Sequence, residues 1–418
     1  MTARLFLPTF NLIFACAAGA QLTVPSTAPI RIEEAKALAA GKEMREWHFD
    51  KLPKELADFP PTVRGAFLRV VCEDHQFSTA CVELVRDDFS RRYYPLKALR
   101  DDDRALAEKM QAELDAKTKP KEAVAYPTKY ESYTPERDAA VCNFKETDHF
   151  LFHWGNDKEG SGKDWWKDDR QAMTFAWFER VWRHFEAAGA PMPMAAGTPN
   201  EAKRAKIPIY ITGSGLPKHK DGFAFGGESI IMHPGALGPG SSVVGHEFTH
   251  TMQLHMGGFR NSPFVGWFWE CHANWSSHQF MPDYAGAFEV WLARAHYELN
   301  SSRHNYGSWL FLQQLAEDPR FGPGFCYDVW LKNRKNEKDA SIEDPIQTFM
   351  RIGVERGVWK GDGCAGFGDA IGEMAARRVT MDFSPHWAYT RALRFMEKSD
   401  EAARLRTTLE RVPDRAGW

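Results

Sequence analysis

The sequence predicts an α+β protein, with a mixed sheet and one polar helix, then a mainly helical C-terminal half, and an N-terminal accessory region in front. Two observations lead to this prediction. Short runs rich in β-branched residues, bounded by glycine and proline, lie near the middle of the chain and are typical of strands. Apolar residues recur at helical spacing before and after these runs. At 418 residues the chain has room for two or three domains, each with its own core.

Residues 1–20 have the features of a secretory signal peptide. A basic residue precedes a mostly apolar stretch at 5–15, and Ala18-Gly19-Ala20 forms a small-x-small cleavage site. We therefore expect an exported protein, periplasmic or extracellular; the alternative is an N-terminal helix of the mature chain. The run that ends at Cys16 also resembles a lipobox, which would make the protein a lipoprotein anchored through Cys16.

The composition excludes several kinds of partner. The chain has 53 basic and 56 acidic side chains without a basic stripe, so no nucleic-acid partner is expected. No run of 18 apolar residues predicts a transmembrane span. The 15 tryptophans indicate either an aromatic core, which their helical spacing favours, or a carbohydrate-binding surface. Six cysteines remain after the signal, and an exported chain can pair them as disulfides in any of about 15 ways. The oligomeric state is left open.

Residues 21–142 form an N-terminal region that we interpret as an accessory domain or, alternatively, as an inhibitory propeptide. Residues 101–116 predict a charged amphipathic helix whose apolar residues stand four apart. Proline-containing stretches at 118–121 and 126–135 predict a linker to the next region.

Within residues 143–260, the sequence predicts a sheet region and the polar helix that follows it. Strands are expected at 148–154, 207–212 and 229–233, and an amphipathic helix at 170–188 lies between the first two. The last strand would border the cleft beside the polar helix, where an extended peptide could pair with a sheet edge. His233 at its end is interpreted as an ordinary loop histidine.

The helix expected at 241–255 begins after Pro239-Gly240, with a serine as N-cap, and carries the pattern His-Glu-x-x-His at 246–250. Residues four apart lie on one face of a helix, so His246 and His250 can bind the same metal ion. Glu247 stands beside them, where it can act on a water molecule. The pattern is typical of zinc hydrolases, and the alternative is a surface helix with incidental histidines.

A catalytic zinc ion takes three protein ligands and keeps a fourth position for water. Gln253 and Met256 occupy the positions where the longer metzincin pattern has glycine and histidine, which excludes that class. Glu270 is the candidate third ligand, because it stands among aromatic residues, where a carboxylate needs a cation. His272 is the alternative ligand. Cys271 is excluded because adjacent helix positions point about 100° apart.

Four stretches together resemble a known family, namely residues 148–156, 246–253, 269–275 and 305–310. They are similar to a group of secreted bacterial domains of unknown function that carry a gluzincin-like motif. The nineteen residues between the second histidine and the glutamate match the spacing of thermolysin-like gluzincins. Over roughly residues 145–390, the resemblance implies a gluzincin-type zinc metallopeptidase with a zincin-like catalytic domain.

The resemblance also suggests roles for residues around the metal. Asn274 falls where gluzincins have an aspartate that accepts a hydrogen bond from a ligand histidine; asparagine accepts the same bond without the charge. A further residue should stabilise the oxyanion of the reaction, usually a tyrosine or histidine. Tyr306 is the candidate because it stands in a family-like stretch. The alternatives are His304, Tyr327, His386 and Tyr389.

Residues 261–418 are expected to form a mainly helical region that carries the third ligand, with helices at 287–299, 306–316 and 365–379. Together these features predict a secreted zinc metallopeptidase, with Zn²⁺ held by His246, His250 and Glu270. It would hydrolyse peptide bonds by a zinc-activated water with Glu247 as general base. Two alternatives remain, a zincin-fold binding module for glycan or cell-wall material and a zinc hydrolase of a non-peptide ester or amide.

Overall fold

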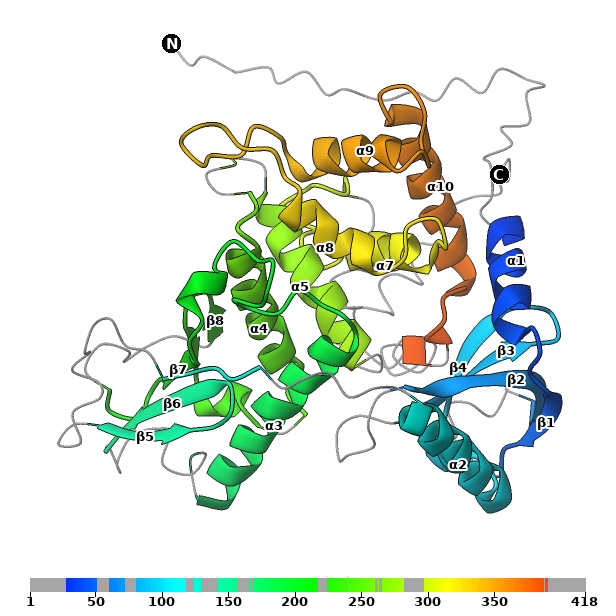
Figure 1. Ribbon diagram of the computed structural model, residues 1–418, viewed down its shortest axis with the longest axis horizontal. Coiled ribbons are helices and arrows are strands. Elements are labelled where there is room, and N and C mark those ends of the chain that lie inside the picture. The colour runs from blue at the N-terminus through cyan, green and yellow to red at the C-terminus, as the bar shows by residue number, and fades with distance from the viewer. Residues whose placement is uncertain are drawn as a thin grey trace, which may run out of the picture.

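The computed structural model confirms the α+β class, with two separate sheets and a helical C-terminal half (Figure 1). Three predicted features lie outside the described residues. They are the signal peptide, which includes Cys16, the cysteine Cys72, and most of the helix expected at 287–299. In the described part of the chain, no helix is both long and apolar enough to span a membrane. The structure describes residues 28–50, 60–71, 80–117, 124–128, 142–156, 166, 168–216, 224–238, 240–259, 262, 265–281, 297–386 and 388–389.

The N-terminal region is an antiparallel four-stranded meander with its own core. The strands are β1 (Met44–His48), β2 (Thr62–Val71), β3 (Cys81–Arg86) and β4 (Arg91–Pro95), paired in that order. The expected charged helix is present as α2 (Asp101–Lys117), which packs on β2. The helix α1 (Ala28–Ala39) contacts β2 and β3. Buried side chains of this core include Trp47, Phe67, Leu84, Leu99 and Ala107. The described residues of this region thus form a sheet with a core of its own.

The second sheet is mixed, with strand order β5-β6-β7-β9-β8. Three parallel strands form its centre, β6 (Phe150–Gly155), β7 (Ile207–Ile211) and β9 (Ile230–Met232), which confirms the three expected strands. Antiparallel strands close both edges, β5 (Cys142–Glu146) and β8 (Ala224–Gly226). Neither edge strand was predicted, and β8 is only three residues long and contains glycine.

The helices α3 (Asp168–Ala187) and α4 (Ser242–Met256) pack on one face of this sheet. The ring of Phe150 on β6 lies 5.2 Å from that of Phe178 on α3 and 5.8 Å from that of Phe248 on α4. This aromatic contact fixes α4 against the sheet. Tyr126, expected in a linker, is buried in the same region and packs edge-on against Trp182.

The C-terminal half is helical, as expected, and packs on the side of α4 away from the sheet (Figure 1). The helix expected at 306–316 begins three residues later. Trp182, Trp275, Trp309 and Trp330 are fully buried, so tryptophan serves the core, as its spacing indicated. Cys271, Cys326 and Cys364 are free thiols. The helices are α5 (Gly266–Phe280), α7 (Trp309–Glu317), α8 (Gly324–Leu331), α9 (Pro345–Glu355) and α10 (Cys364–Thr380).

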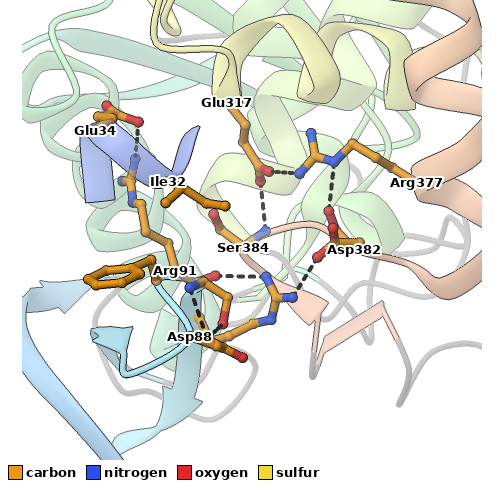
Figure 2. A pocket seen from close by; sticks show the side chains of 11 residues that line it. Ile32, Glu34, Asp88, Arg91, Glu317, Arg377, Asp382 and Ser384 are labelled. Carbon is orange, nitrogen blue, oxygen red and sulfur yellow. Dashed lines mark hydrogen bonds and ion pairs between the residues drawn. The ribbon is translucent and has the colours of Figure 1, made fainter. Parts of the chain in front are cut away.

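The N-terminal domain is joined to the C-terminal half through a charged seam around a cavity of about 260 Å³ (Figure 2). Arg92 of β4 pairs with Asp382 at 2.5 Å, and the backbone N–H of Tyr93 donates to the carbonyl of Ser384. On the helical side, Glu317 pairs with Arg377 and accepts a hydrogen bond from the backbone of Ser384. This seam fixes one end of α7.

Candidate metal centre

The polar helix α4 has two different sides. Val244, Phe248 and Met252, spaced four apart, are fully buried in the core. The helix ends at Gly257, whose positive φ of 71° suits a residue without a side chain. Ser241 occupies the N-cap position as expected, but its side chain makes no capping hydrogen bond. With its apolar side facing the core, the helix presents His246 and His250 toward α5.

Three side chains from α4 and α5 converge on one point. The Nε2 atom of His246 lies 3.1 Å from Nε2 of His250 and 3.1 Å from Oε2 of Glu270. The distance from Nε2 of His250 to the same carboxylate oxygen is 3.7 Å. Within the described residues, these three form the only group of histidine, cysteine and acidic side chains close enough to hold a metal ion. The structure thus brings together the three predicted ligands.

Each ligand histidine is held from behind by a side-chain amide. Nδ1 of His246 lies 2.9 Å from Oδ1 of Asn274, as the family resemblance implied. Nδ1 of His250 lies 2.7 Å from Oε1 of Gln253, a contact that the sequence analysis missed. The only signal for it was the position of Gln253, three residues after His250, where side chains on one helix meet.

Glu247 is 6% exposed and lies between α4 and the edge strand β8. The backbone N–H of Gly226 donates to its carboxylate. Burial raises the pKa of Glu247, and the neighbouring carboxylate of Glu270 adds to this effect, while His246 and His250 oppose it. A carboxyl group whose pKa lies above its ordinary value is better suited to take up and release a proton near neutral pH.

The charges of the three converging groups are strongly coupled. Burial acts to raise the pKa of Glu270, but hydrogen bonds and charge interactions with His246 and His250 outweigh it and hold that pKa well below its usual range. Burial acts to lower the pKa of His250, but Glu270 outweighs it and raises that pKa. Glu270 is therefore an anion beside two imidazoles, a donor set that suits a divalent cation such as zinc.

The group opens into a cavity of about 650 Å³. Its lining comes from β8 and the turn that follows it, from α4, from α5 and from Tyr306. Every charged residue that lines it in the described chain is acidic, and none comes from the N-terminal domain. The lining residues are Gly226, Gly227, Glu228, Ser229, His246, Glu247, His250, Leu254, Trp269, Glu270 and Tyr306.

Of the five candidates for the oxyanion role, only Tyr306 lines this cavity. Its ring stacks on His246 with centroids 6.0 Å apart, and burial together with Glu270 raises the pKa of its hydroxyl to about 12. Tyr327 and Tyr389 are buried in the helical core, and His304 is also buried. Nδ1 of His386 lies 2.8 Å from the carbonyl oxygen of Met381.

The alternative ligand His272, the excluded Cys271 and the loop histidine His233 are not part of the converging group. His272 is fully buried, and burial lowers its pKa to about 3. Its Nδ1 contacts the amide of Gln253. Cys271 is also fully buried. The ring of His233 accepts a hydrogen bond from the backbone of Gly235, as befits a loop residue.

Comparison with known proteins places most of the chain in one family. No curated protein and no solved structure matches it. One family model matches residues 115–418, which begin at the end of α2 and include the whole metal centre. The N-terminal domain thus lies outside the matched part. The chain belongs to the family of unknown function DUF6055.

Proposed function

We propose that this protein is a zinc metallopeptidase of the gluzincin type. One observation carries the proposal, the convergence of His246, His250 and Glu270 next to the buried carboxylate of Glu247. Two imidazoles and one carboxylate are a known ligand set of zinc hydrolases that keep one position free for reaction.

The spacing of the donor atoms supports zinc. Bonds of about 2.0–2.1 Å in a tetrahedral arrangement place ligand atoms about 3.3–3.4 Å from each other. The three separations here are 3.1, 3.1 and 3.7 Å. The donor set also fits, since both histidines have their Nδ1 atoms bound to amides and so present Nε2 to the metal.

When bound, zinc supplies a Lewis acid that polarises a carbonyl group and lowers the pKa of a water ligand to about 7. Glu247 lies where it can accept a proton from the attacking water and pass it to the leaving amine. Its burial and raised pKa suit both transfers. Tyr306 lines the same cavity with its hydroxyl beside Glu270, and it can donate a hydrogen bond to the developing oxyanion.

The cavity walls suit an extended peptide. The strand β8 is an antiparallel edge of the sheet, and its residue Gly226 lines the cavity. A peptide can add to such an edge by main-chain hydrogen bonds and so cross the metal centre. Leu254 and Trp269 offer an apolar surface for a substrate side chain.

We further propose that the protein is exported after removal of the signal peptide. N-terminal sequencing of the mature chain tests this proposal, and the expected first residue is Gln21.

Peptide hydrolysis by zinc-loaded wild type and Glu247→Gln tests the proposal. We expect Glu247→Gln to bind zinc normally and to lose about 10²–10⁴-fold in kcat, because the proton acceptor is gone. Glu228→Gln is the matched control, since it changes an exposed carboxylate of the same cavity and should keep its rate within a few-fold. Equal rates for wild type and Glu247→Gln would refute the role of Glu247. Wild-type cleavage of esters but of no peptide in a broad library would favour a non-peptide hydrolase.

A further inference from the structure

Gln253 is a buried amide that makes contacts with three different groups. Its side chain is fully buried in α4, one turn beyond His250. Its Oε1 atom lies 2.7 Å from Nδ1 of His250. Its Nε2 atom lies 2.9 Å from the carbonyl oxygen of Trp269 and 3.1 Å from Nδ1 of His272.

The Trp269 carbonyl fixes the orientation of this amide. A carbonyl oxygen only accepts hydrogen bonds, so the NH₂ group of Gln253 must face it, and the amide oxygen must face His250. The reversed orientation would place two oxygen atoms 2.9 Å apart in a buried site and leave the NH₂ group without an acceptor at Trp269. His250 therefore donates from Nδ1, and the lone pair of its Nε2 atom points toward Glu270.

The same amide keeps His272 apart from the metal centre. Nδ1 of His272 must accept from the NH₂ group of Gln253, so it has no lone pair left for a metal ion. The His272 ring is enclosed by Trp275, Tyr327 and Trp330. Gln253 thus assigns opposite roles to two histidines, one as a ligand and one as part of the core.

We propose that Gln253 is a positioning residue that fixes the tautomer and ring orientation of His250 for metal binding. The inference deepens the proposed function and rests on its metal centre, but not on peptidase activity. Asn274 acts in the same way on His246, since it accepts from that ring and donates to the carbonyl of Tyr306. Both amides therefore connect a ligand histidine to an aromatic residue of the cavity wall.

The experiment measures zinc affinity by chelator competition in Gln253→Met, a variant of similar length without polar atoms. We expect affinity about 10–100-fold below that of wild type, the usual effect of removing a partner of a ligand histidine. Gln279→Met is the matched control, because Gln279 also donates to a backbone carbonyl, that of Trp275, but touches no ligand. Its affinity should equal that of wild type. Gln253→Glu restores an acceptor for His250 and should recover part of the loss.

A second measurement does not depend on any variant. Nitrogen NMR of histidine-labelled, zinc-loaded wild type should show His250 with its proton on Nδ1 and the metal on Nε2. A proton on Nε2 would overturn the proposal, as would unchanged zinc affinity in folded Gln253→Met. These outcomes are separate from those for peptidase activity. If wild type binds zinc and cleaves no peptide, the peptidase proposal fails while the role of Gln253 stands.

Discussion

A methyl group on Gly226 would lie 2.0 Å from the carbonyl oxygen of Glu247, so the edge strand β8 rests directly on the backbone of the metal-binding helix. The same methyl group would lie 2.9 Å from Cβ of His250. Backbone atoms cannot yield as a flexible side chain does. Glycine at this position therefore brings the sheet edge to the metal centre and lets its N–H reach the carboxylate of Glu247.

Replacing Gly226 with alanine should separate β8 from α4. We expect a loss of about 1–3 kcal/mol in the free energy of unfolding, typical of an overpacked site, and a larger fractional loss of activity than of zinc affinity. Urea unfolding and peptide kinetics would measure both. Gly266→Ala is the control, since no heavy atom lies within 4 Å of the added methyl group at that position. If Gly226→Ala matched that control in unfolding free energy and in rate, the close contact between β8 and α4 would contribute neither to stability nor to activity.

Removing the hydroxyl of Tyr306, which is hydrogen-bonded to Glu270, should slow the reaction. We expect Tyr306→Phe to lower kcat by about 10²-fold or more, as the loss of one oxyanion donor does in other hydrolases. Tyr327→Phe removes a hydroxyl from the core and should leave kcat unchanged, because Tyr327 does not line the cavity. Similar kcat values for the two variants would exclude the proposed role of Tyr306.

Replacing Asn274 with aspartate should separate two functions of one side chain. Aspartate still accepts the hydrogen bond from His246, so we expect zinc affinity to be kept or raised. It cannot donate to the carbonyl of Tyr306, which lies 2.7 Å from Nδ2 of Asn274. The turn that carries Tyr306 should shift, and kcat should fall. A variant with weaker zinc binding and unchanged kcat would contradict this account.

The seam between the N-terminal domain and the helices should be sensitive to acid. Burial raises the pKa of Glu317, but Arg377 and hydrogen bonds from Gln313 and Ser384 outweigh it and hold that pKa below its ordinary value. A lowered folded-state pKa gives stability that is present above the unfolded value of about 4.3 and is lost as the pH falls through the folded pKa.

Glu317→Gln should therefore destabilise the protein by about 3–5 kcal/mol at pH 7, the range for breaking one partner of a buried ion pair. The difference from wild type should shrink as the pH falls below the unfolded value of about 4.3 and through the lower folded pKa, where wild type also becomes neutral. Glu355→Gln, which breaks exposed pairs with Arg351 and Arg334, should cost less than about 1 kcal/mol. Denaturant unfolding as a function of pH measures this; a constant difference across the range would contradict it.

The sequence was most informative where chemistry and periodicity coincide. His246 and His250 stand four apart on a helix whose other side is apolar, and that pattern allows few arrangements. Glu270 followed from its aromatic surroundings and its spacing from His250. Two of the central strands were predicted from β-branched runs bounded by turns, and the strand at 148–154 was predicted from a short apolar run.

Other parts of the site depend on contacts that no local pattern encodes. In the sequence, Gln253 served only to exclude the longer metzincin pattern. Its contacts with α5 could not be predicted, because they form through tertiary packing. The strand β8 is short and contains glycine, so it lacks a strand pattern, yet it forms one wall of the cavity. Tyr306 could not be separated from four other candidates until the fold placed it beside His246.

X-ray diffraction at the zinc absorption edge, from crystals of the zinc-loaded protein, tests the central claim most directly. We predict one anomalous peak about 2.0–2.1 Å from Nε2 of His246, from Nε2 of His250 and from the carboxylate of Glu270. A peak that excludes Glu270, or no peak at this site in zinc-loaded crystals, would contradict the account.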